Sequence, residues 1–488
     1  MTLTMLKRII PLFVTIAYLL WALPVAAQDS TPTVTPTSLQ EASPQPASGP
    51  VYIIQPGDGL SSIASKFGVT LSDLMAANGI TDPNNISAGA KIIIPGLEGI
   101  TGILDTEIIG YGDTLHSISR RNQISEDLLR KLNHITSPSE LYAGVSLVYP
   151  QKDNFSPLSN RVSLVVGETL LEASVRAQAD PWTLVTLNSL KGSWAATPGD
   201  VLYTTGEAPA GSPEPNGMPS AFASVTVSPL PMKQGGTSEI IVQAASGVTL
   251  SGTLVDKRLH FFPLQDGKQV SLQGIHAMLD PGPYPLILEA TLPDGSKQSF
   301  EQMVIVQSGY YPNDPVLTVE PATIDPAVND PELQKITDLT EPDTAQKSWQ
   351  GIFKNPSVFP DCFTSRYGNR RIYIGQGTDE KFHSFHSGLD FCGGLGLQIT
   401  APADGVVIFA GPLTVRGNAT IIDHGWGVYS GIWHQSEIDV QVGQTVKAGD
   451  VIGLVGGTGR VTGAHLHWEI WVNGIQVDPM DWLENIYP

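Results

Sequence analysis

The sequence predicts a multidomain chain: three βααβ modules, an all-β sandwich and a C-terminal, antiparallel all-β domain. Three observations predict this fold class. A pattern repeats between residues 51 and 206, apolar and polar residues alternate over 220–308, and histidines gather on Gly- and Val-rich segments near the end of the chain. Gly 49 and Pro 38 among 488 residues favour short strands, turns and linkers over long helices.

The charge balance excludes one large class of function. Lys+Arg 27 against Asp+Glu 47 gives a net charge of -20. A nucleic-acid partner needs an electropositive surface, so we expect no binding to nucleic acid. Two cysteines are too few for a disulfide framework. No stable protein partner is evident from the sequence.

The first residues have the pattern of an export signal. Lys7 and Arg8 precede an apolar run over 9–22, and Val25-Ala26-Ala27 offers a small-residue cleavage site. We expect a signal peptide over 1–27 and a secreted or cell-envelope protein, with an uncleaved membrane anchor as the alternative. Residues 28–50, rich in Thr, Pro and Ser, are predicted to be a linker.

The repeat has a period of 55 residues and predicts three units, 51–96, 106–151 and 161–206. Four columns keep this spacing: Gly57, Gly112 and Gly167; Leu60, Leu115 and Leu170; Asn78, Asn133 and Asn188; Gly89, Gly144 and Gly199. Four columns at one period indicate a true internal repeat. Each unit reads as a strand, a tight turn, an amphipathic helix, a second helix and a closing strand.

The repeat resembles the LysM module. The resemblance rests on Tyr-x-Ile-x-x-Gly-Asp-x-Leu, then Leu-x-x-x-Asn, then Gly followed by Ile-x-Ile-Pro. It implies binding to glycans that contain N-acetylglucosamine, through a groove between the loop after the first strand and the loop before the second. The third copy departs from the pattern at Glu168 and Thr205. The candidate glycan-binding residues carried over are Gly57, Asp58, Asn78, Gly112, Asp113 and Asn133. For each one, the alternative is a role in a turn or a helix cap.

Two further segments precede the terminal domain. Residues 220–308 alternate as in Ala223-Ser224-Val225-Thr226-Val227, with turn signals every ~8–12 residues, which predicts an immunoglobulin-like sandwich. Residues 312–356 are polar and rich in Pro, and we expect a linker with short helices over 331–336 and 345–349. The terminal domain is predicted over 357–488.

The terminal domain holds six of the ten histidines. His386 and Asp390 are four residues apart, and His465 and His467 are at i, i+2, which places both imidazoles on one face of a strand. Imidazoles and a carboxylate from neighbouring segments suit zinc, which in catalytic sites keeps three protein ligands and one position for water. Additional histidines would move a proton or stabilise an oxyanion.

A longer set of motifs closely resembles the lysostaphin-type (LytM-like) zinc endopeptidases. The segments Phe-His-Ser-Gly-Leu-Asp, Ala-Pro-Ala-Asp-Gly-Val-Val, Ile-Asp-His-Gly and Gly-Ala-His-Leu-His-Trp-Glu occur in that order. The resemblance implies one Zn²⁺ per chain, held by His386, Asp390 and His467. It also implies His434 and His465 as catalytic residues, one a general base and the other an electrostatic stabiliser, with the assignment open between them.

Some residues near these motifs are expected to have other roles. His424 is predicted to be structural, and His383 flanks the first ligand without being one. A basic segment with Arg366 and Arg371 is either structural or faces substrate. Cys362 and Cys392 are expected to form a disulfide in an exported protein, and two unpaired thiols are the alternative.

These features together predict a secreted cell-wall hydrolase. We expect a zinc-dependent endopeptidase that cuts peptide stems or cross-links of peptidoglycan, tethered to its glycan by the modules. Two alternatives stay open. One is a catalytically silent regulator of other wall hydrolases, and the other is a glycan-binding structural protein of the wall.

Overall fold

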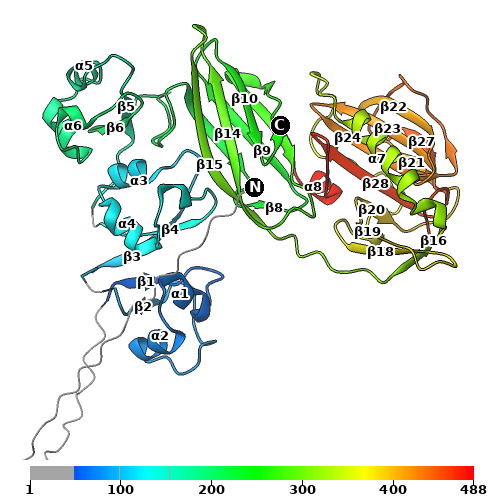
Figure 1. Ribbon diagram of the computed structural model, residues 1–488, viewed down its shortest axis with the longest axis horizontal. Coiled ribbons are helices and arrows are strands. Elements are labelled where there is room, and N and C mark those ends of the chain that lie inside the picture. The colour runs from blue at the N-terminus through cyan, green and yellow to red at the C-terminus, as the bar shows by residue number, and fades with distance from the viewer. Residues whose placement is uncertain (1–48, 98, 153, 211) are drawn as a thin grey trace, which may run out of the picture. The chain divides into compact units, whose positions relative to one another are not determined.

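The computed structural model describes residues 49–97, 99–152, 154–210 and 212–488 (Figure 1). The predicted signal peptide and almost all of the linker over 28–50 lie outside the described residues. Within the described ranges, no helix combines the length and the apolar character needed to cross a membrane.

The first two repeat units, modules 1 and 2 (51–96 and 106–151), each have the predicted βααβ order. Module 1 contains β1 (Val51–Ile53), α1 (Leu60–Phe67), α2 (Leu71–Asn78) and β2 (Lys91–Ile93). Module 2 contains β3 (Ile103–Ile108), α3 (Leu115–Asn122), α4 (Glu126–Asn133), a 3-10 turn (Pro138–Glu140) and β4 (Ser146–Pro150). Since β1 pairs in parallel with β3, the two modules share one sheet of order β2-β1-β3-β4.

Local sequence explains why these short helices form. Leu60, Ile63 and Phe67 place one apolar face of α1 in the core, and Gly68 ends the helix in the left-handed conformation with φ 65°. Thr70 begins α2 by accepting a hydrogen bond from the Asp73 amide at 3.0 Å. These caps end α1 and begin α2 at the turn between them, as the repeat requires.

The third unit, module 3 (161–206), repeats the same order of elements. It contains β5 (Asn160–Ser163), α5 (Leu170–Arg176), α6 (Pro181–Leu187), a 3-10 turn (Ser193–Ala195) and β6 (Val201–Thr204); the two helices and two strands are labelled in Figure 1. Its strands form their own two-stranded sheet around a small core of Val162, Leu170, Leu184 and Leu202.

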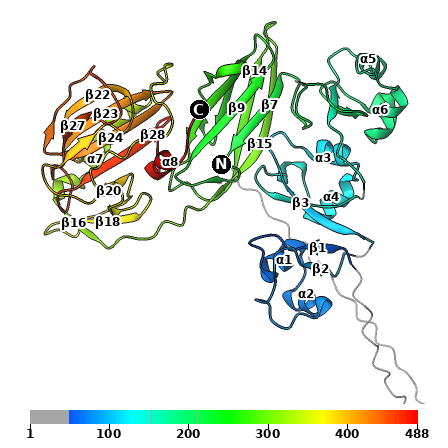
Figure 2. The same ribbon diagram turned by 180° about the vertical axis from the view of Figure 1, so that it is seen from behind.

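The alternating segment forms two sheets around one core. The first sheet has the order β11-β10-β14-β15-β8 and the second β12-β13-β9-β7; β14 and β15 are labelled in Figure 1 and β7 and β9 in Figure 2. The strands are β7 (Phe222–Ser228), β8 (Met232–Lys233), β9 (Thr237–Ala244), β10 (Thr249–Leu254), β11 (Lys257–Arg258), β12 (Phe262–Pro263), β13 (Lys268–Gly274), β14 (Gly282–Thr291) and β15 (Lys297–Gln307). A 3-10 turn (Gln265–Gly267) precedes β13. Ile240, Val242, Leu286, Leu288 and Val304 fill the space between the sheets. We call this region the sandwich.

The terminal domain is built on a large, mainly antiparallel sheet of order β17-β20-β28-β24-β23-β22-β26. Two three-stranded sheets accompany it, β16-β18-β19 and β21-β27-β25, and β29 pairs with β28. The elements before the central hairpin are β16 (Leu317–Val319), a 3-10 turn (Pro321–Thr323), α7 (Pro326–Thr340), β17 (Phe363–Ser365), β18 (Arg370–Gly375), β19 (Lys381–Phe385), β20 (Leu389–Phe391) and β21 (Gln398–Thr400). The remaining elements are β22 (Gly405–Pro412), β23 (Asn418–Gly425), β24 (Val428–Gln435), β25 (Glu437–Ile438), β26 (Thr445–Val446), β27 (Val451–Leu454), β28 (Leu466–Val472), β29 (Ile475–Val477) and α8 (Pro479–Glu484).

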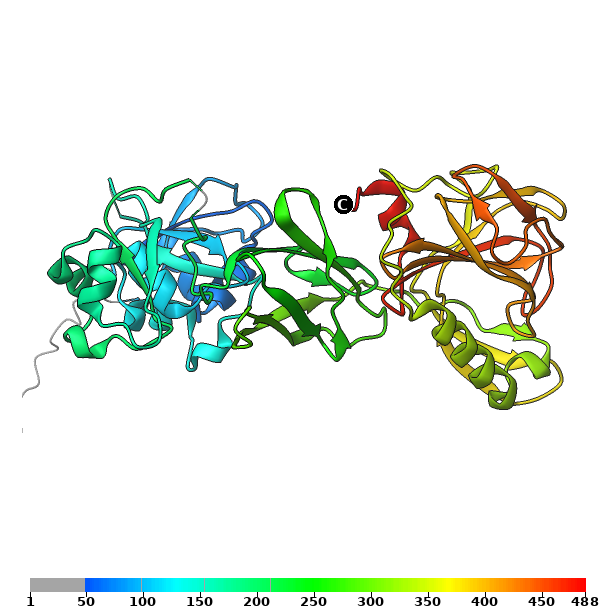
Figure 3. The ribbon, with the colours of Figure 1, turned by 90° about the horizontal axis from the view of Figure 1, so that it is seen from above.

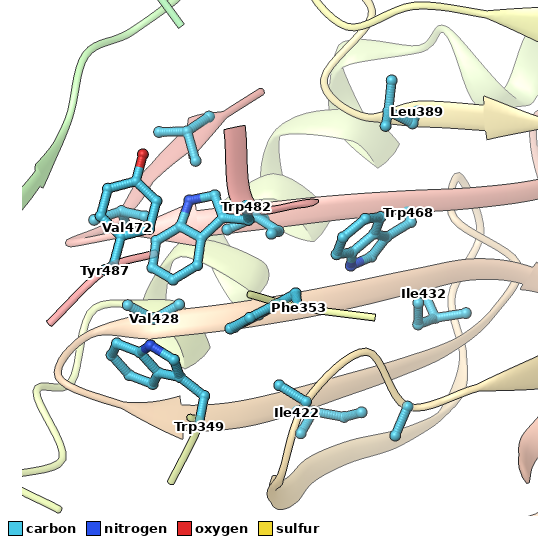
Figure 4. Packing of buried hydrophobic residues seen from close by; sticks show 14 of the residues in the cluster. Trp349, Phe353, Leu389, Ile422, Val428, Ile432, Trp468, Val472, Trp482 and Tyr487 are labelled. Carbon is cyan, nitrogen blue, oxygen red and sulfur yellow. The ribbon is translucent and has the colours of Figure 1, made fainter. Parts of the chain in front are cut away.

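The segment 312–356 is part of this domain, whereas the sequence predicted a linker. It supplies strand β16 and a 15-residue helix, α7, the yellow-green helix against the terminal domain in Figure 3. Ile336 of α7 is fully buried against the sheet, and Trp349 and Phe353 point into the main core beside Trp482 (Figure 4). The helix expected over 331–336 lies within α7, and 345–349 is not helical. The polar composition of this segment did not indicate a packed helix, because only one face of α7 is buried.

Candidate metal centre

Three neighbouring strands bring the predicted histidines together. Asp390 of β20 stands opposite His467 of β28, and His467 in turn stands opposite Trp433 of β24. His434 follows Trp433 on β24, and His386 and His465 lie just before β20 and β28. The pairing of strands far apart in the chain therefore places all five predicted residues around one point.

Three donor atoms converge at the centre of this group. The Asp390 Oδ1 atom is 3.0 Å from His386 Nε2 and 2.7 Å from His467 Nδ1, and these two nitrogens are 3.1 Å apart. His465 Nε2 is 3.3 Å from the same oxygen. A second set of donor atoms within reach of one ion consists of His434, His465 and His467. His467 belongs to both sets.

Backbone carbonyls orient the imidazoles. The Nδ1 atoms of three histidines lie 2.7–2.8 Å from carbonyl oxygens: His386 from Arg366, His434 from Thr458 and His465 from Gly463. A carbonyl oxygen only accepts, so each Nδ1 carries the proton and each Nε2 keeps its lone pair. For His386 and His465 that lone pair faces Asp390. His467 has the opposite orientation, with Nε2 toward Glu469 and Nδ1 2.7 Å from Asp390 Oδ1. The Nε2 atom of His386, the Nδ1 atom of His467 and the carboxylate oxygen of Asp390 therefore converge, and this donor set fits zinc.

Burial and mutual charge set the protonation of the cluster. Burial lowers the pKa of His386 and, together with the charges of His467 and His465, holds the pKa of His434 well below its ordinary value. Burial alone would raise the pKa of Asp390, but the His386 and His467 imidazoles hold it well below its usual range. Burial acts to lower the pKa of His467, and the Asp390 carboxylate more than offsets this and raises it. Neutral His386 and ionised Asp390 are the forms that bind a metal ion.

The sequence named Arg371 as either structural or facing substrate, and it assigned no role to Glu469. Arg371 donates from Nη2 to Asp390 Oδ2 at 3.2 Å and from Nε to Asp314 at 3.0 Å, so it fixes the free oxygen of the candidate ligand. Glu469 faces His467 Nε2 at 3.2 Å and accepts from Ser387 at 2.6 Å. The i, i+2 spacing of His467 and Glu469 on β28 was the available signal for Glu469. Asp314 lies 57 residues before Arg371, and no local pattern relates them.

The remaining two histidines of the domain lie outside the cluster. His424 is completely buried, with Nδ1 2.8 Å from the Asp404 carbonyl and Nε2 2.8 Å from the Ser430 hydroxyl. Burial lowers the pKa of His424 to about 4. His383 is exposed on β19 and belongs to neither donor set. Both observations agree with the structural and flanking roles expected for them.

A cleft of about 570 Å³ opens beside the cluster. It is lined by residues of the cluster and by residues of α7, among them His386, His434, His465, His467, Asn329 and Leu333. Glu332 of α7 accepts hydrogen bonds from the Val415 and Arg416 amides at 2.8 and 3.0 Å. The helix therefore fixes the loop before β23 and forms one wall of the cleft.

A disulfide joins Cys362 and Cys392, whose Cα atoms are 5.4 Å apart. Cys362 precedes β17 and Cys392 follows β20, and these strands pair through Phe363 and Phe391. The bridge therefore braces the strand that carries Asp390.

In the modules, the predicted glycan-binding side chains make structural hydrogen bonds. The Asn78 side chain links the end of α2 to β2: it donates to the Ile93 carbonyl at 2.7 Å and accepts from the Ile93 amide at 2.6 Å. Asn133 makes the same pair with Val148. Asp58 and Asp113 accept from backbone amides of their own turns, at 2.8 and 3.1 Å. Gly57 and Gly112 occupy these turns with φ 90° and 102°.

The antiparallel sheet and the His/Asp donor set of the terminal domain are typical of a metallopeptidase, and this domain follows the βααβ modules in the chain. Comparison with known proteins identifies individual domains. Residues 384–479 match the model of peptidase family M23, and residues 52–95 and 108–150 match the LysM domain. The chain therefore carries an M23 metallopeptidase domain of the LytM type and two LysM domains. The LysM matches cover modules 1 and 2 and do not include module 3.

Three similar proteins show the extent of the likeness. The chain is 43% identical over 95 residues to the DD-carboxypeptidase/endopeptidase Mpg of Neisseria meningitidis, covering 20% of this chain and 22% of that protein. It is 42% identical over 95 residues to the peptidoglycan DD-endopeptidase ShyA of Vibrio cholerae, again covering 20% and 22%. The catalytic domain of lysostaphin from Staphylococcus simulans matches at 34% identity and a TM-score of 0.20, covering 21% of this chain and 80% of that domain. The aligned region thus spans about a fifth of the length of the curated relatives.

Proposed function

We propose that this chain is an exported, zinc-dependent endopeptidase that cleaves peptide stems or cross-links of peptidoglycan. The observation that carries the proposal is the convergence of His386, Asp390 and His467 within 3.1 Å of one another, at the edge of a cleft that His434 and His465 also line. The similarity to ShyA, which is named a peptidoglycan DD-endopeptidase, supports peptidoglycan as the substrate class.

His386, Asp390 and His467 would hold the metal. A zinc ion bound there supplies Lewis-acid chemistry for amide hydrolysis. Arg371 and Glu469 keep the ligands in place: Arg371 bonds to the second oxygen of Asp390, and Glu469 faces the outer nitrogen of His467.

His434 and His465 would handle protons and developing negative charge. Their ring centres are 5.3 Å apart, and the Nδ1 atom of each donates to a backbone carbonyl. The depressed pKa of His434 keeps its Nε2 unprotonated at neutral pH, so it can accept a proton from an attacking water. Once protonated, either imidazole can stabilise an oxyanion by donating from Nε2.

The domain plan that accompanies this function is also a proposal. Module 3 has the element order of the other two and the same asparagine bridge, from Asn188 to the Tyr203 amide and carbonyl, which supports a third, divergent LysM module. The two sheets over 220–308 support an immunoglobulin-like sandwich. The peptidase domain would begin near residue 312 and not at 357. The modules would tether the enzyme to the glycan and raise the local concentration of its substrate.

The test is hydrolysis of purified peptidoglycan by the full chain. We expect new amino groups to appear, a mass-spectrometric inventory of the fragments to show cleaved peptides with intact glycan, and a chelator to stop the reaction. A protein that binds zinc and clears nothing would instead support the silent-regulator alternative.

A further inference from the structure

The two loops that connect strands and helices differ among the three modules. We call the loop after the first strand the turn loop and the loop before the second strand the closing loop; their glycines are Gly57 and Gly89, Gly112 and Gly144, and Gly167 and Gly199. In modules 1 and 3 all four glycines are exposed, and an added Cβ atom would meet nothing within 4 Å. In module 2 both glycines are buried, and the added atoms would lie 2.7 Å from Met218 and 2.9 Å from Pro231. One repeat unit thus has its loops covered.

One side chain of the sandwich satisfies backbone groups from both loops of module 2. Gln302 of β15 accepts from the Gly112 amide at 2.8 Å and donates to the carbonyls of Asp113 and Leu141, at 3.1 Å each. Gln302 is only 7% exposed. A buried amide that pairs three backbone groups excludes water and any other ligand from them.

The closing loop of module 2 also bonds to β15 through its backbone. Ala143 forms a parallel bridge beside Val304: its amide donates to the Met303 carbonyl at 2.8 Å, and its carbonyl accepts from the Ile305 amide at 3.2 Å. This arrangement is strand addition within one chain. Ala143 is fully buried, whereas Ala88, at the same position in module 1, is exposed.

The turn loop of module 2 carries an aromatic anchor that the other modules lack. The Tyr111 hydroxyl lies 3.0 Å from the carbonyl oxygens of Leu286 and Phe300, and its ring packs edge-to-face on Phe300 with centroids 5.4 Å apart. Module 1 has Pro56 and module 3 has Val166 at this position, and both are exposed. An aromatic ring with a bonded hydroxyl is typical of an anchor in an interface.

We propose that module 2 is an intramolecular docking module: its turn and closing loops bind the sandwich, and not glycan. The binding of glycan, which rests on the proposed function, then falls to the exposed loops of modules 1 and 3. The backbone groups of the module 2 loops are already paired, so a sugar can reach them only after the sandwich is displaced. The chain would use one repeat for attachment to itself and the others for attachment to the wall.

Amide hydrogen exchange of the intact protein tests the docking directly. We expect the Gly112 and Ala143 amides to exchange at least ~100-fold more slowly than those of Gly57 and Gly167, because opening requires release of the sandwich. Exchange at Gly112 within about tenfold of the rate at Gly57 would overturn the proposal. This measurement needs no ligand and stands whether or not the chain binds glycan.

Matched substitutions test the consequence for binding, with insoluble chitin as the probe because it contains no peptide to be cut. The double variant Ala88→Arg/Pro198→Arg places a long side chain in each exposed closing loop and should lower the bound fraction at least ~5-fold. Ala143→Arg should leave binding within about twofold of wild type but lower the melting temperature, because it disrupts the docked face. Equal loss of binding in Ala143→Arg and in the double variant would overturn the proposal.

Gln302→Ala separates docking from misfolding. It removes three hydrogen bonds from the sandwich side without adding volume, so we expect faster exchange at Gly112 and unchanged binding to chitin. Unchanged exchange at Gly112 would count against the docking. Wild-type protein that binds neither chitin nor peptidoglycan would contradict the tethering function alone, since the exchange data would still decide the docking.

Discussion

The terminal domain buries histidines in two settings, and the comparison shows what makes a buried imidazole available for chemistry. His424 has both ring nitrogens occupied, by the Asp404 carbonyl and the Ser430 hydroxyl. In the cluster, His386 and His434 each have Nδ1 paired with a backbone carbonyl, and the Nε2 atom of His386 lies 3.0 Å from the carboxylate of Asp390. Burial lowers the pKa in both settings. The kind of second partner, and not burial, distinguishes them: the Nε2 atom of His424 faces a hydroxyl, whereas that of His386 faces two other candidate metal ligands, Asp390 and His467.

The largest expected effect is on His467, which lies in both donor sets. His467→Ala should abolish zinc binding and lower kcat/KM at least ~10³-fold, because the Lewis acid supplies several kcal/mol of transition-state stabilisation. Zinc content by atomic absorption and hydrolysis of peptidoglycan check this. His383→Ala, at an exposed position on β19 outside both donor sets, is the control and should keep both properties.

His465→Ala separates proton transfer from metal binding within the cluster. We expect the variant to keep its zinc and lose ~10²–10⁴-fold in kcat, the usual contribution of a positioned acid or base. Loss of the metal together with activity would move His465 into the ligand set and make His434, His465 and His467 the binding triad.

Glu469→Gln tests how much the partner of a candidate metal ligand, here His467, contributes to zinc affinity and activity. Burial acts to raise the pKa of Glu469, but the bond to His467 and the charge of Arg416 lower it overall, so the carboxylate is ionised beside the ring. Replacing it should weaken zinc affinity or activity by ~10–100-fold. The exposed Glu437→Gln on β25 serves as the control, and an equal loss there would contradict the assignment.

The smallest effect concerns His424, where we expect a change in stability and none in catalysis at neutral pH. Its pKa is about 4 in the folded state and 6.5 as the ordinary value, so the unfolded chain binds a proton first as the pH falls. Folding is therefore destabilised progressively from about pH 6.5 to about pH 4, by roughly 3 kcal/mol in all. Urea unfolding of the metal-free protein across this range measures the slope. His424→Gln should flatten the curve, and an unchanged curve would show that other groups carry it.

Much of the site could be predicted because its residues sit in short motifs. His386 and Asp390 are separated by the short turn before β20, and His465 and His467 have the i, i+2 spacing that places two side chains on one strand face. Asp314, which braces Arg371, lies in a segment predicted to be a linker, and so does α7, which forms a wall of the cleft. These were missed because amphipathic segments in polar sequence reveal their buried face only when the partner surface is known.

The sequence by itself determined the repeat, the order of the modules and the residues able to bind a metal, because period, turn glycines and donor spacing are local properties. Tertiary structure alone decided which distant partners, such as Asp314, hold the site residues in place and which module has its loops covered. Gly57, Gly112 and Gly167 occupy equivalent positions in the repeat, yet only Gly112 bonds to a side chain, Gln302, which lies 190 residues further along the chain. Burial depends on such distant partners, and no local pattern contains them.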